Sequence, residues 1–345
     1  MSVPAQIEIA LAQAREARAR GDLIAAQQLL DGLELDDLDP DHPLAAVLAW
    51  RRSKLAHDLG DPRTALAILE PLLSAPADPF AHYPRGLNAA GSLARAAWDR
   101  LGYGDPTLRL LWRRCSDAWR ARGDGYLAHT AEVQLSWDQA CAGDLGALSE
   151  TLGAFAALQP GDLEGGPTRH PRAPDAPGSV PFLQLDLART ALRAGTWAQQ
   201  PELLERAEDL LEEAAEEVGS QRTRDHWFLE PIALARLRLG RDDPDGYVSA
   251  WLALAPSLDH PRAGFHRALA RAEASRDDPH QAAAIFEDAE RQARAGGYGP
   301  EWEIDPALQR ALLLSIPAPT AAARIESHGV HVFDATAAIL GALEP

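Results

Sequence analysis

The sequence is poor in sulfur and in aromatic residues. Of its 345 residues two are cysteine, one is methionine and 6% are aromatic. Cys115 and Cys141 cannot build a disulfide framework, and without a paired CxxC the sequence indicates neither zinc binding nor dithiol redox chemistry. We therefore expect both cysteines to be buried free thiols, which fits a reducing, cytoplasmic environment.

Long apolar runs and an excess of positive charge are also lacking. No run approaches the roughly 18–20 apolar residues of a membrane span, and residues 1–21 lack the basic start and apolar stretch of a signal peptide. Against 51 Asp+Glu there are 33 Lys+Arg, a formal charge of −18, and Lys54 is the single lysine. Such a chain lacks the cationic surface that binds phosphate backbones or anionic lipid, so we expect no direct nucleic-acid partner and no membrane partner.

Recognisable catalytic motifs are missing too. The sequence has no Gly-rich phosphate loop, no GxSxG elbow and no HExxH pattern. The acidic runs 36–41 and 241–245 lie between expected helices, where capping and turn formation explain them. His328 and His331 lie near Glu326, but no third strong metal ligand is evident. We therefore expect no catalytic, cofactor-binding or metal-binding residues, and no cofactor.

The residues that are abundant favour helices. Ala and Leu together make up about a third of the chain, and both are strong helix formers. Val, Ile, Phe and Tyr, which favour strands, are scarce. This composition predicts an all-α protein.

A turn recurs along the chain at intervals of about 36 to 52 residues, the spacing of helix-turn-helix repeats. In it, Gly ends one helix in a left-handed conformation and Asp caps the next, often with Pro in the first turn. The clear examples are Gly21-Asp22, Gly60-Asp61-Pro62, Gly104-Asp105-Pro106 and Gly143-Asp144, and the looser ones are Gly195-Thr196, Gly240 with Asp242-Asp243-Pro244, and Asp277-Asp278-Pro279.

Small residues stand at a fixed distance before these turns, where they would let two antiparallel helices approach closely. Seven residues before each turn lie Ala14, Ser53, Ala97, Ser136, Ala188, Ala233 and, as the exception, Leu269. After the turn, small residues recur at Ala26, Ala65 and Ala282, each followed by a larger one at Leu30, Leu69 and Phe286. The alternation predicts that side chains of one helix fill gaps in its partner.

With these residues the chain resembles the tetratricopeptide repeat family, over about residues 5–296 and best at Gly21 to Pro40 and Gly60 to Pro71. The resemblance implies an α-α superhelix of about seven antiparallel helix pairs. The repeats are degenerate, since the aromatic and Leu-Gly signature of the first helix is mostly missing and the Ala position is replaced by Arg109, Leu148, Gln200 and Asp245. Other arrays of helical hairpins remain open.

The predicted helix pairs are 4–20 with 23–35, 43–59 with 62–74, 84–101 with 106–122, 125–142 with 145–158, 181–194 with 200–218, 222–239 with 244–255, and 261–275 with 279–295. We divide the chain into N-terminal repeats (1–158), a Pro/Gly-rich loop (159–180), C-terminal repeats (181–296) and a helical capping tail (297–345). In the tail we expect helices at Ile304–Ile316, Thr320–Ser327 and Asp334–Leu343, with an apolar segment around Val330.

Charge is distributed unevenly over the pairs. Most first helices carry more Arg and Lys than Asp and Glu, whereas the second helix 201–218 has eight acidic residues against Arg206. In the resembled family, first helices line a concave groove that holds extended peptides or partner helices. Carried over by register, the groove positions are Trp50, Lys54, His57, Trp98, Trp137 and Arg189. Large aromatic and cationic side chains suit recognition, although the tryptophans could equally be core residues.

We therefore expect a non-enzymatic interaction module whose groove binds a partner protein or peptide, with acidic partners included. A module that senses a small molecule or short peptide is the main alternative. An acidic mimic that competes for a nucleic-acid-binding protein and an all-α enzyme are further alternatives, and the sequence nominates no residues for the last.

Overall fold

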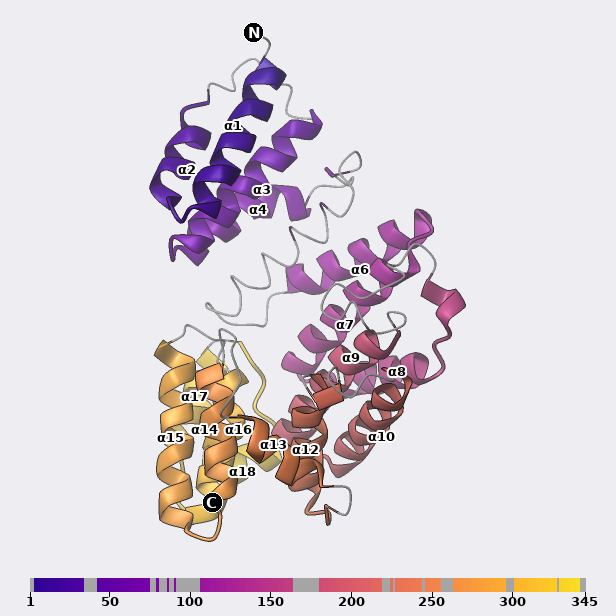
Figure 1. Ribbon diagram of the computed structural model, residues 1–345, viewed down its shortest axis with the longest axis vertical. Coiled ribbons are helices and arrows are strands. Elements are labelled where there is room, and N and C mark those ends of the chain that lie inside the picture. Colours follow the sequence, from indigo (N-terminus) through magenta and orange to yellow (C-terminus); the bar gives the residue numbers. More distant parts are fainter. Residues whose placement is uncertain are drawn as a thin grey trace. The chain divides into compact units, whose positions relative to one another are not determined.

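The structure is a computed structural model, and it describes residues 3–33, 42–74, 79–80, 86, 90, 106–163, 180–218, 224–225, 227–243, 246–255, 263–295, 301–327 and 329–341. This part of the chain is helical and contains no strand, which confirms the all-α expectation (Figure 1). None of its helices is long and apolar enough to cross a bilayer. The chain divides into an N-terminal unit, 1–101 with 106–118, and a C-terminal unit, 102–105 with 119–345.

Two complete helix pairs form the N-terminal unit. Helix α1 (Val3–Ala19) packs on α2 (Leu23–Asp31), and α3 (Pro43–Asp58) packs on α4 (Pro62–Ser74). Both α1 and α2 also pack against α3, so the pairs share one core, formed by Ala14, Ala17, Ala26, Leu30, Leu48 and Leu55. Helix α6 (Pro106–Ala121) begins in this unit, and the helix predicted before it, 84–101, lies mostly outside the described residues.

The C-terminal unit continues the pattern with four more pairs. These are α7 (Gly125–Cys141) with α8 (Leu145–Ala156), α9 (Val180–Ala198) with α10 (Pro201–Val218), α12 (Leu229–Leu239) with α13 (Tyr247–Leu254), and α14 (Ala263–Ala274) with α15 (Pro279–Ala295). Each pair packs against the next, as an α-α superhelix requires. Cys115 and Cys141 are free and buried, as expected.

Aspartate caps recur at the starts of the helices, at predicted turns for Asp22, Asp61, Asp144 and Asp278 and at an unpredicted position for Asp124. The carboxylates of Asp22, Asp61, Asp124, Asp144 and Asp278 each accept the backbone N–H three residues further on, at 2.9 to 3.1 Å. Gly21, Gly60 and Gly143, which precede three of these caps, have φ of 82°, 89° and 91°, a conformation that Gly adopts without steric cost. Gly104-Asp105 lies outside the described residues.

The small residues predicted to lie between paired helices are buried, and one of them contacts the partner helix directly. Ser53, Ala188 and Ala233 have no exposed surface, and the Ser53 hydroxyl donates to the Ala65 carbonyl of the partner helix at 2.7 Å. The larger residues that follow the turns, Leu30, Leu69 and Phe286, are at most 1% exposed. Both the small and the large residues of the predicted alternation are thus buried where the structure describes them.

The turn predicted at Gly195-Thr196 is wrong. Helix α9 runs on to Ala198 and the turn comes at Gln199, which has φ of 54°. Gly195 lies inside the helix, where a Cβ would come within 2.9 Å of Leu204 Cδ2 on α10. This glycine therefore permits close helix packing and does not end the helix.

The predicted loop 159–180 is also shorter than expected at both ends. Pro160–Leu163 forms a short 3-10 helix, η1, that packs on α7, and Val180 is already the first residue of α9. The residues between them lie outside the described part.

The tail contains three helices, α16 (Glu301–Leu314), α17 (Pro319–Ser327) and α18 (Asp334–Leu340). Helix α16 packs along α15, as a cap would, but α16 and α18 also pack on α9. Between α17 and α18 the His331 N–H donates to the Cys141 carbonyl at 2.8 Å, and the Thr336 hydroxyl donates to the Trp197 carbonyl. The tail therefore joins the last pair to the first two pairs of the C-terminal unit.

Removing one of the aspartate caps tests the turn assignment. Asp144→Ala leaves the first N–H groups of α8 without their acceptor, so we expect the free energy of unfolding to fall by about 1 kcal/mol. Asp144→Asn should keep most of the stability, and Asp117→Ala, on the exposed face of α6, serves as a control. Equal urea midpoints for Asp144→Ala and Asp117→Ala would show that this cap does not stabilise the unit.

Candidate functional site

A cavity of about 410 Å³ lies within the C-terminal unit. Its walls come from the first helices of successive pairs, α7, α9, α12 and α14, and from α13, α16 and the segment before α12. We call it the aromatic cavity. Its volume falls within the range of about 300–1,000 Å³ that is typical of small-molecule sites.

Aromatic rings make up much of the wall. Five of the nine tryptophans of the chain line it, together with Phe265: Trp137, Trp197, Trp227, Trp251 and Trp302. Several rings are in edge-to-face contact. The ring centroids of Trp137 and Trp197 are 6.3 Å apart, and those of Phe265 and Trp302 are 5.5 Å apart. Such edge-to-face contacts hold the rings in place, so the cavity has a defined shape.

Helical periodicity brings the lining side chains together. On α12, Glu230, Leu234 and Arg238 recur every four residues and therefore share one face. On α9, a second such face carries Arg189, Leu192, Arg193, Thr196 and Trp197. Each helix thus presents both apolar and charged groups to the cavity.

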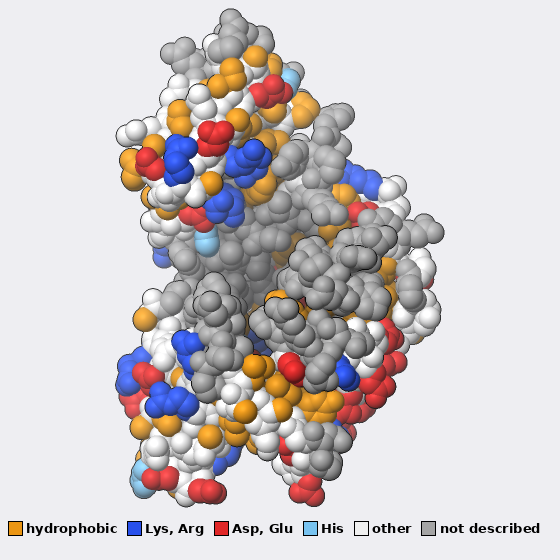
Figure 2. Space-filling view, viewed as in Figure 1, with side chains coloured by type: hydrophobic (Ala, Val, Ile, Leu, Met, Phe, Trp, Pro, Cys, Tyr) orange, Lys and Arg blue, Asp and Glu red, His pale blue; other side chains and the backbone are white. Residues whose placement is uncertain are grey.

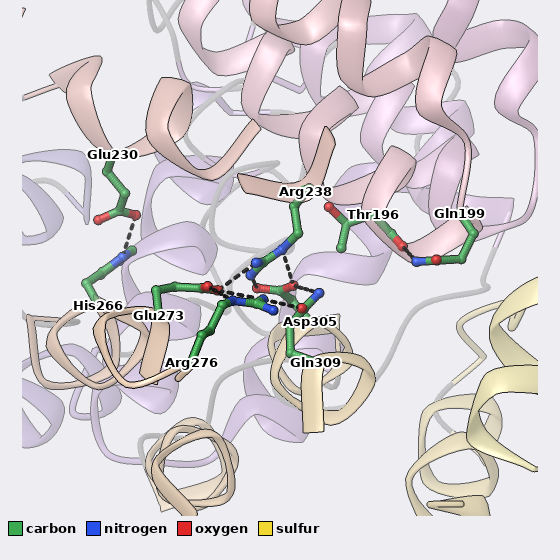
Figure 3. Close-up of polar contacts among 9 residues, drawn as sticks. All are labelled: Thr196, Gln199, Glu230, Arg238, His266, Glu273, Arg276, Asp305 and Gln309. Atoms are coloured by element: carbon green, nitrogen blue, oxygen red, sulfur yellow. Dashed lines mark hydrogen bonds and ion pairs between the residues drawn. The ribbon is translucent and has the colours of Figure 1, made fainter. Parts of the chain in front are cut away.

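Arg238 is held by two carboxylates from different helices (Figure 3). Its Nε and Nη2 donate to the two oxygens of Asp305 at 3.0 and 2.7 Å, and its Nη1 donates to Glu273 Oε1 at 2.6 Å. Burial would lower the pKa of Arg238, but the two acids outweigh it and raise that pKa. The guanidinium is therefore fixed as a cation that ties α12 to α14 and α16.

Glu273 is the most deeply buried member of this cluster, with 1% of its side chain exposed. Burial raises the pKa of Glu273, but Arg238 and Arg276 together overcome that effect, so the pKa ends below its ordinary value. Arg276 also donates to Gln309 Oε1 at 2.6 Å, which links the cluster to α16.

A second contact between titratable side chains lies nearer the start of α12. His266 Nδ1 on α14 is 2.6 Å from Glu230 Oε1 (Figure 3). Burial raises the pKa of Glu230, but His266, and less strongly Arg189, outweigh burial and lower it. Arg189 itself donates to the Trp227 carbonyl at 2.8 Å. Glu230 is therefore an ionised carboxylate in the cavity wall.

Arg193 connects the tail to the repeats. Its guanidinium lies 3.8 Å from the ring centroid of Trp302 on α16 and 5.7 Å from that of Trp137 on α7. Cation–π contacts of this kind are worth about 0.5–2 kcal/mol. Because α16 supplies Trp302, Ile304 and Asp305, the tail is an integral part of the cavity wall.

Two of the six predicted groove residues, Trp137 and Arg189, line the aromatic cavity. Trp137 is only 4% exposed, so it is also a core residue. Trp50, Lys54 and His57 lie on α3 of the N-terminal unit, and Trp98 lies outside the described residues.

The three predicted groove residues on α3 lie near charged side chains of the N-terminal unit. The Arg51 guanidinium lies 4.3 Å from the Trp50 ring centroid, and His57 Nδ1 is 3.9 Å from Asp58. Lys54 borders a small hollow between α1 and α3 together with Arg15, Arg18 and Arg51. Burial and, secondly, Arg18 lower the pKa of Lys54, and Arg51 adds to the effect.

Sequence reasoning missed most of the cavity wall. Glu230 and Arg238 could have been found from their four-residue spacing around Leu234 on one predicted helix. Trp197 was assigned to the turn between two predicted helices, and Trp302 to the predicted capping tail. The Glu230–His266 pair joins positions 36 residues apart, and no local pattern marks it.

The lining residues include neither Ser nor Cys. In the described part of the chain no three His, Cys, Asp or Glu side chains gather as a metal site would require. His331, one of the two histidines considered for a metal, packs on Phe333 with centroids 4.7 Å apart, and His328 lies outside the described residues. The arrangement is therefore suited to binding a guest by stacking and hydrogen bonding.

Comparison with known proteins gives no match, either to a family model or to a curated protein.

The lowered pKa of Glu273 predicts how stability depends on pH. A depressed carboxyl pKa contributes stability above the unfolded value, about 4.3, and this contribution is lost as pH falls through the folded pKa. Glu273→Gln should cost roughly 3 kcal/mol at pH 7 because it leaves Arg238 and Arg276 undercompensated. Between about pH 5 and pH 3, the free energy of unfolding of Glu273→Gln should also fall by less than that of the wild type. Urea unfolding across this range checks both effects, with exposed Glu217→Gln as control, and parallel stability curves would contradict them.

Proposed function

We propose that this chain is a non-enzymatic binding protein whose C-terminal unit takes a compact guest into the aromatic cavity. The guest is a small molecule or a few residues of a partner peptide. One observation carries the proposal: a space of about 410 Å³ that is lined by five tryptophans from consecutive helix pairs, the segment before α12 and the tail helix α16. We also propose that the helix pairs are tetratricopeptide-like, since their turns and small residues are those of that family.

The size of the cavity argues for a compact guest. A helix about 10 Å wide with a pitch of 5.4 Å occupies roughly 400 Å³ per turn. The cavity therefore has room for about one turn of a partner helix. A longer helix would need an open groove, but here α16 packs on α9 and supplies part of the wall.

Filling the cavity tests the proposal. Leu234→Trp places an indole ring in the cavity from α12. Leu254→Phe adds a smaller volume from α13. Leu312→Trp, at a position that is 50% exposed on α16, is the matched control. Each immobilised full-length variant is incubated with native lysate, and eluted small molecules and peptides are identified by mass spectrometry.

We expect at least one compound or peptide to be recovered by the wild type and by Leu312→Trp but lost from both cavity variants, because the guest and the new side chain compete for one space. Circular dichroism and thermal unfolding establish that the variants fold. Identical recoveries from all four folded proteins would refute the cavity as the binding site.

A second candidate function rests on the N-terminal unit. Arg15, Arg18, Arg51 and Lys54 line one partly apolar hollow, and Asp58 partly balances them through its 2.5 Å contact with Arg18. The lowered pKa of Lys54 shows that its charge is disfavoured there, first by burial and then by Arg18. An acidic segment of a partner would offset this repulsion, so we propose that this face binds such a segment.

Titration with a fluorescein-labelled hexaglutamate peptide tests this second site by anisotropy. Lys54→Ala and Arg51→Ala should each weaken binding several-fold, and added salt should weaken binding by the wild type because exposed charges are screened. Arg63→Ala, at an exposed site on α4, should leave binding unchanged. Equal affinities for all four proteins would reject the proposed site.

A further inference from the structure

The charges in the aromatic cavity favour some guests over others. Its lining carries Arg189, Arg193 and Arg238 against Asp225, Glu230 and Asp305, so its formal charge is zero with His266 neutral. A charged guest would lose its hydration in this cavity without gaining a net countercharge from the wall. The balance therefore favours an uncharged guest.

The cations of the wall are already engaged. Arg238 places three N–H groups on two carboxylates, Arg189 donates to the Trp227 carbonyl, and Arg193 lies with its guanidinium over Trp302. An anionic guest would have to compete with these contacts. The wall is thus poorly prepared to act as a donor toward a carboxylate or phosphate.

Glu230 is different, because it retains capacity as an acceptor. A carboxylate offers about four acceptor positions, and at Glu230 one of its oxygens, Oε1, lies 2.6 Å from His266 Nδ1. Trp251 lies near enough to help lower the pKa of Glu230, yet its indole N–H makes no hydrogen bond of good geometry. The Glu230 side chain is 23% exposed, and it belongs to the cavity lining.

The surroundings of this acceptor are aromatic. Trp251, Trp227, Phe265 and Trp302 line the same cavity, and His266 lies within 6.3 Å of the Trp302 ring and 5.6 Å of the Phe265 ring, centroid to centroid. Indole and phenyl faces stack with a flat guest, and a carboxylate beside them accepts a hydrogen bond from the edge of that guest.

From the Glu230 carboxylate in the cavity lining, the aromatic wall and the balanced charge, we infer that the cavity selects an uncharged, planar aromatic guest with a ring N–H, and that Glu230 accepts this N–H. The inference rests on the proposed function and narrows it from any compact guest to one chemical class. A free heteroaromatic compound and the indole side chain of a partner peptide share this chemistry.

Three matched probes test the inference by isothermal titration calorimetry on the full-length protein. Indole has the ring N–H, 1-methylindole has nearly the same shape without it, and indole-3-acetate adds a negative charge. We expect indole to bind roughly tenfold or more tightly than 1-methylindole, because a hydrogen bond to a charged acceptor is lost in the latter. Indole-3-acetate should bind more weakly than indole.

Glu230→Gln keeps the size of the side chain and removes its charge. In this variant the affinity for indole should fall toward that for 1-methylindole, which should itself change little. Glu202→Gln, an exposed position on α10 outside the cavity, should bind all three probes as the wild type does. Thermal unfolding checks that both variants fold.

Two outcomes would overturn the inference in different ways. Equal affinities for indole and 1-methylindole, or tightest binding of indole-3-acetate, would refute the N–H donor while leaving the cavity as a binding site. If none of the probes binds, the selected class is wrong. The proposed function then fails as well only if the cavity variants Leu234→Trp and Leu254→Phe also retain every compound that the wild type captures.

Discussion

Close contact between paired helices is the constraint on which the rest of the structure depends. Two antiparallel helices can approach closely only where one side chain of each facing pair is small, and Ser53, Ala188 and Ala233 fill that role with no exposed surface. Gly195 extends the same device to the contact between α9 and α10. In the C-terminal unit the first helices α7, α9, α12 and α14 each contribute side chains to the cavity wall, together with α13, α16 and the segment before α12.

The local features of this fold could be predicted from the sequence because each has a local cause. An aspartate caps the N–H groups three residues ahead of it, and a small residue sits two helical turns before a glycine, so both signals are visible in one short stretch. Gly195 shows the limit of such reasoning. The same residue type serves a turn at Gly143 and close packing at Gly195, and only the neighbouring Leu204 distinguishes the two uses.

The site was less predictable because its members come from distant stretches. Trp137 and Arg189 were nominated by register, but Trp302 reaches the cavity through the packing of α16 on α9, which no repeat pattern describes. The charge pattern was also only partly informative. Arg52 donates to the Leu30 carbonyl of α2, and Arg236 pairs with Glu208 and Glu212 of α10, so some of the basic residues of the first helices join neighbouring pairs. The remaining acids of α10 lie on its outer face, where Figure 2 shows acidic side chains gathered along one edge.

The contact between Thr336 and the Trp197 carbonyl spans 139 positions of the sequence. Helix pairs form from neighbouring residues, so the repeats can assemble progressively while the chain is being synthesised. The cavity cannot form progressively in this way, because its wall includes α16. Helix α18 packs on both α16 and α9 and so holds α16 in position on α9. The cavity wall is therefore completed at a later step than the formation of the helix pairs, when the tail packs on α9.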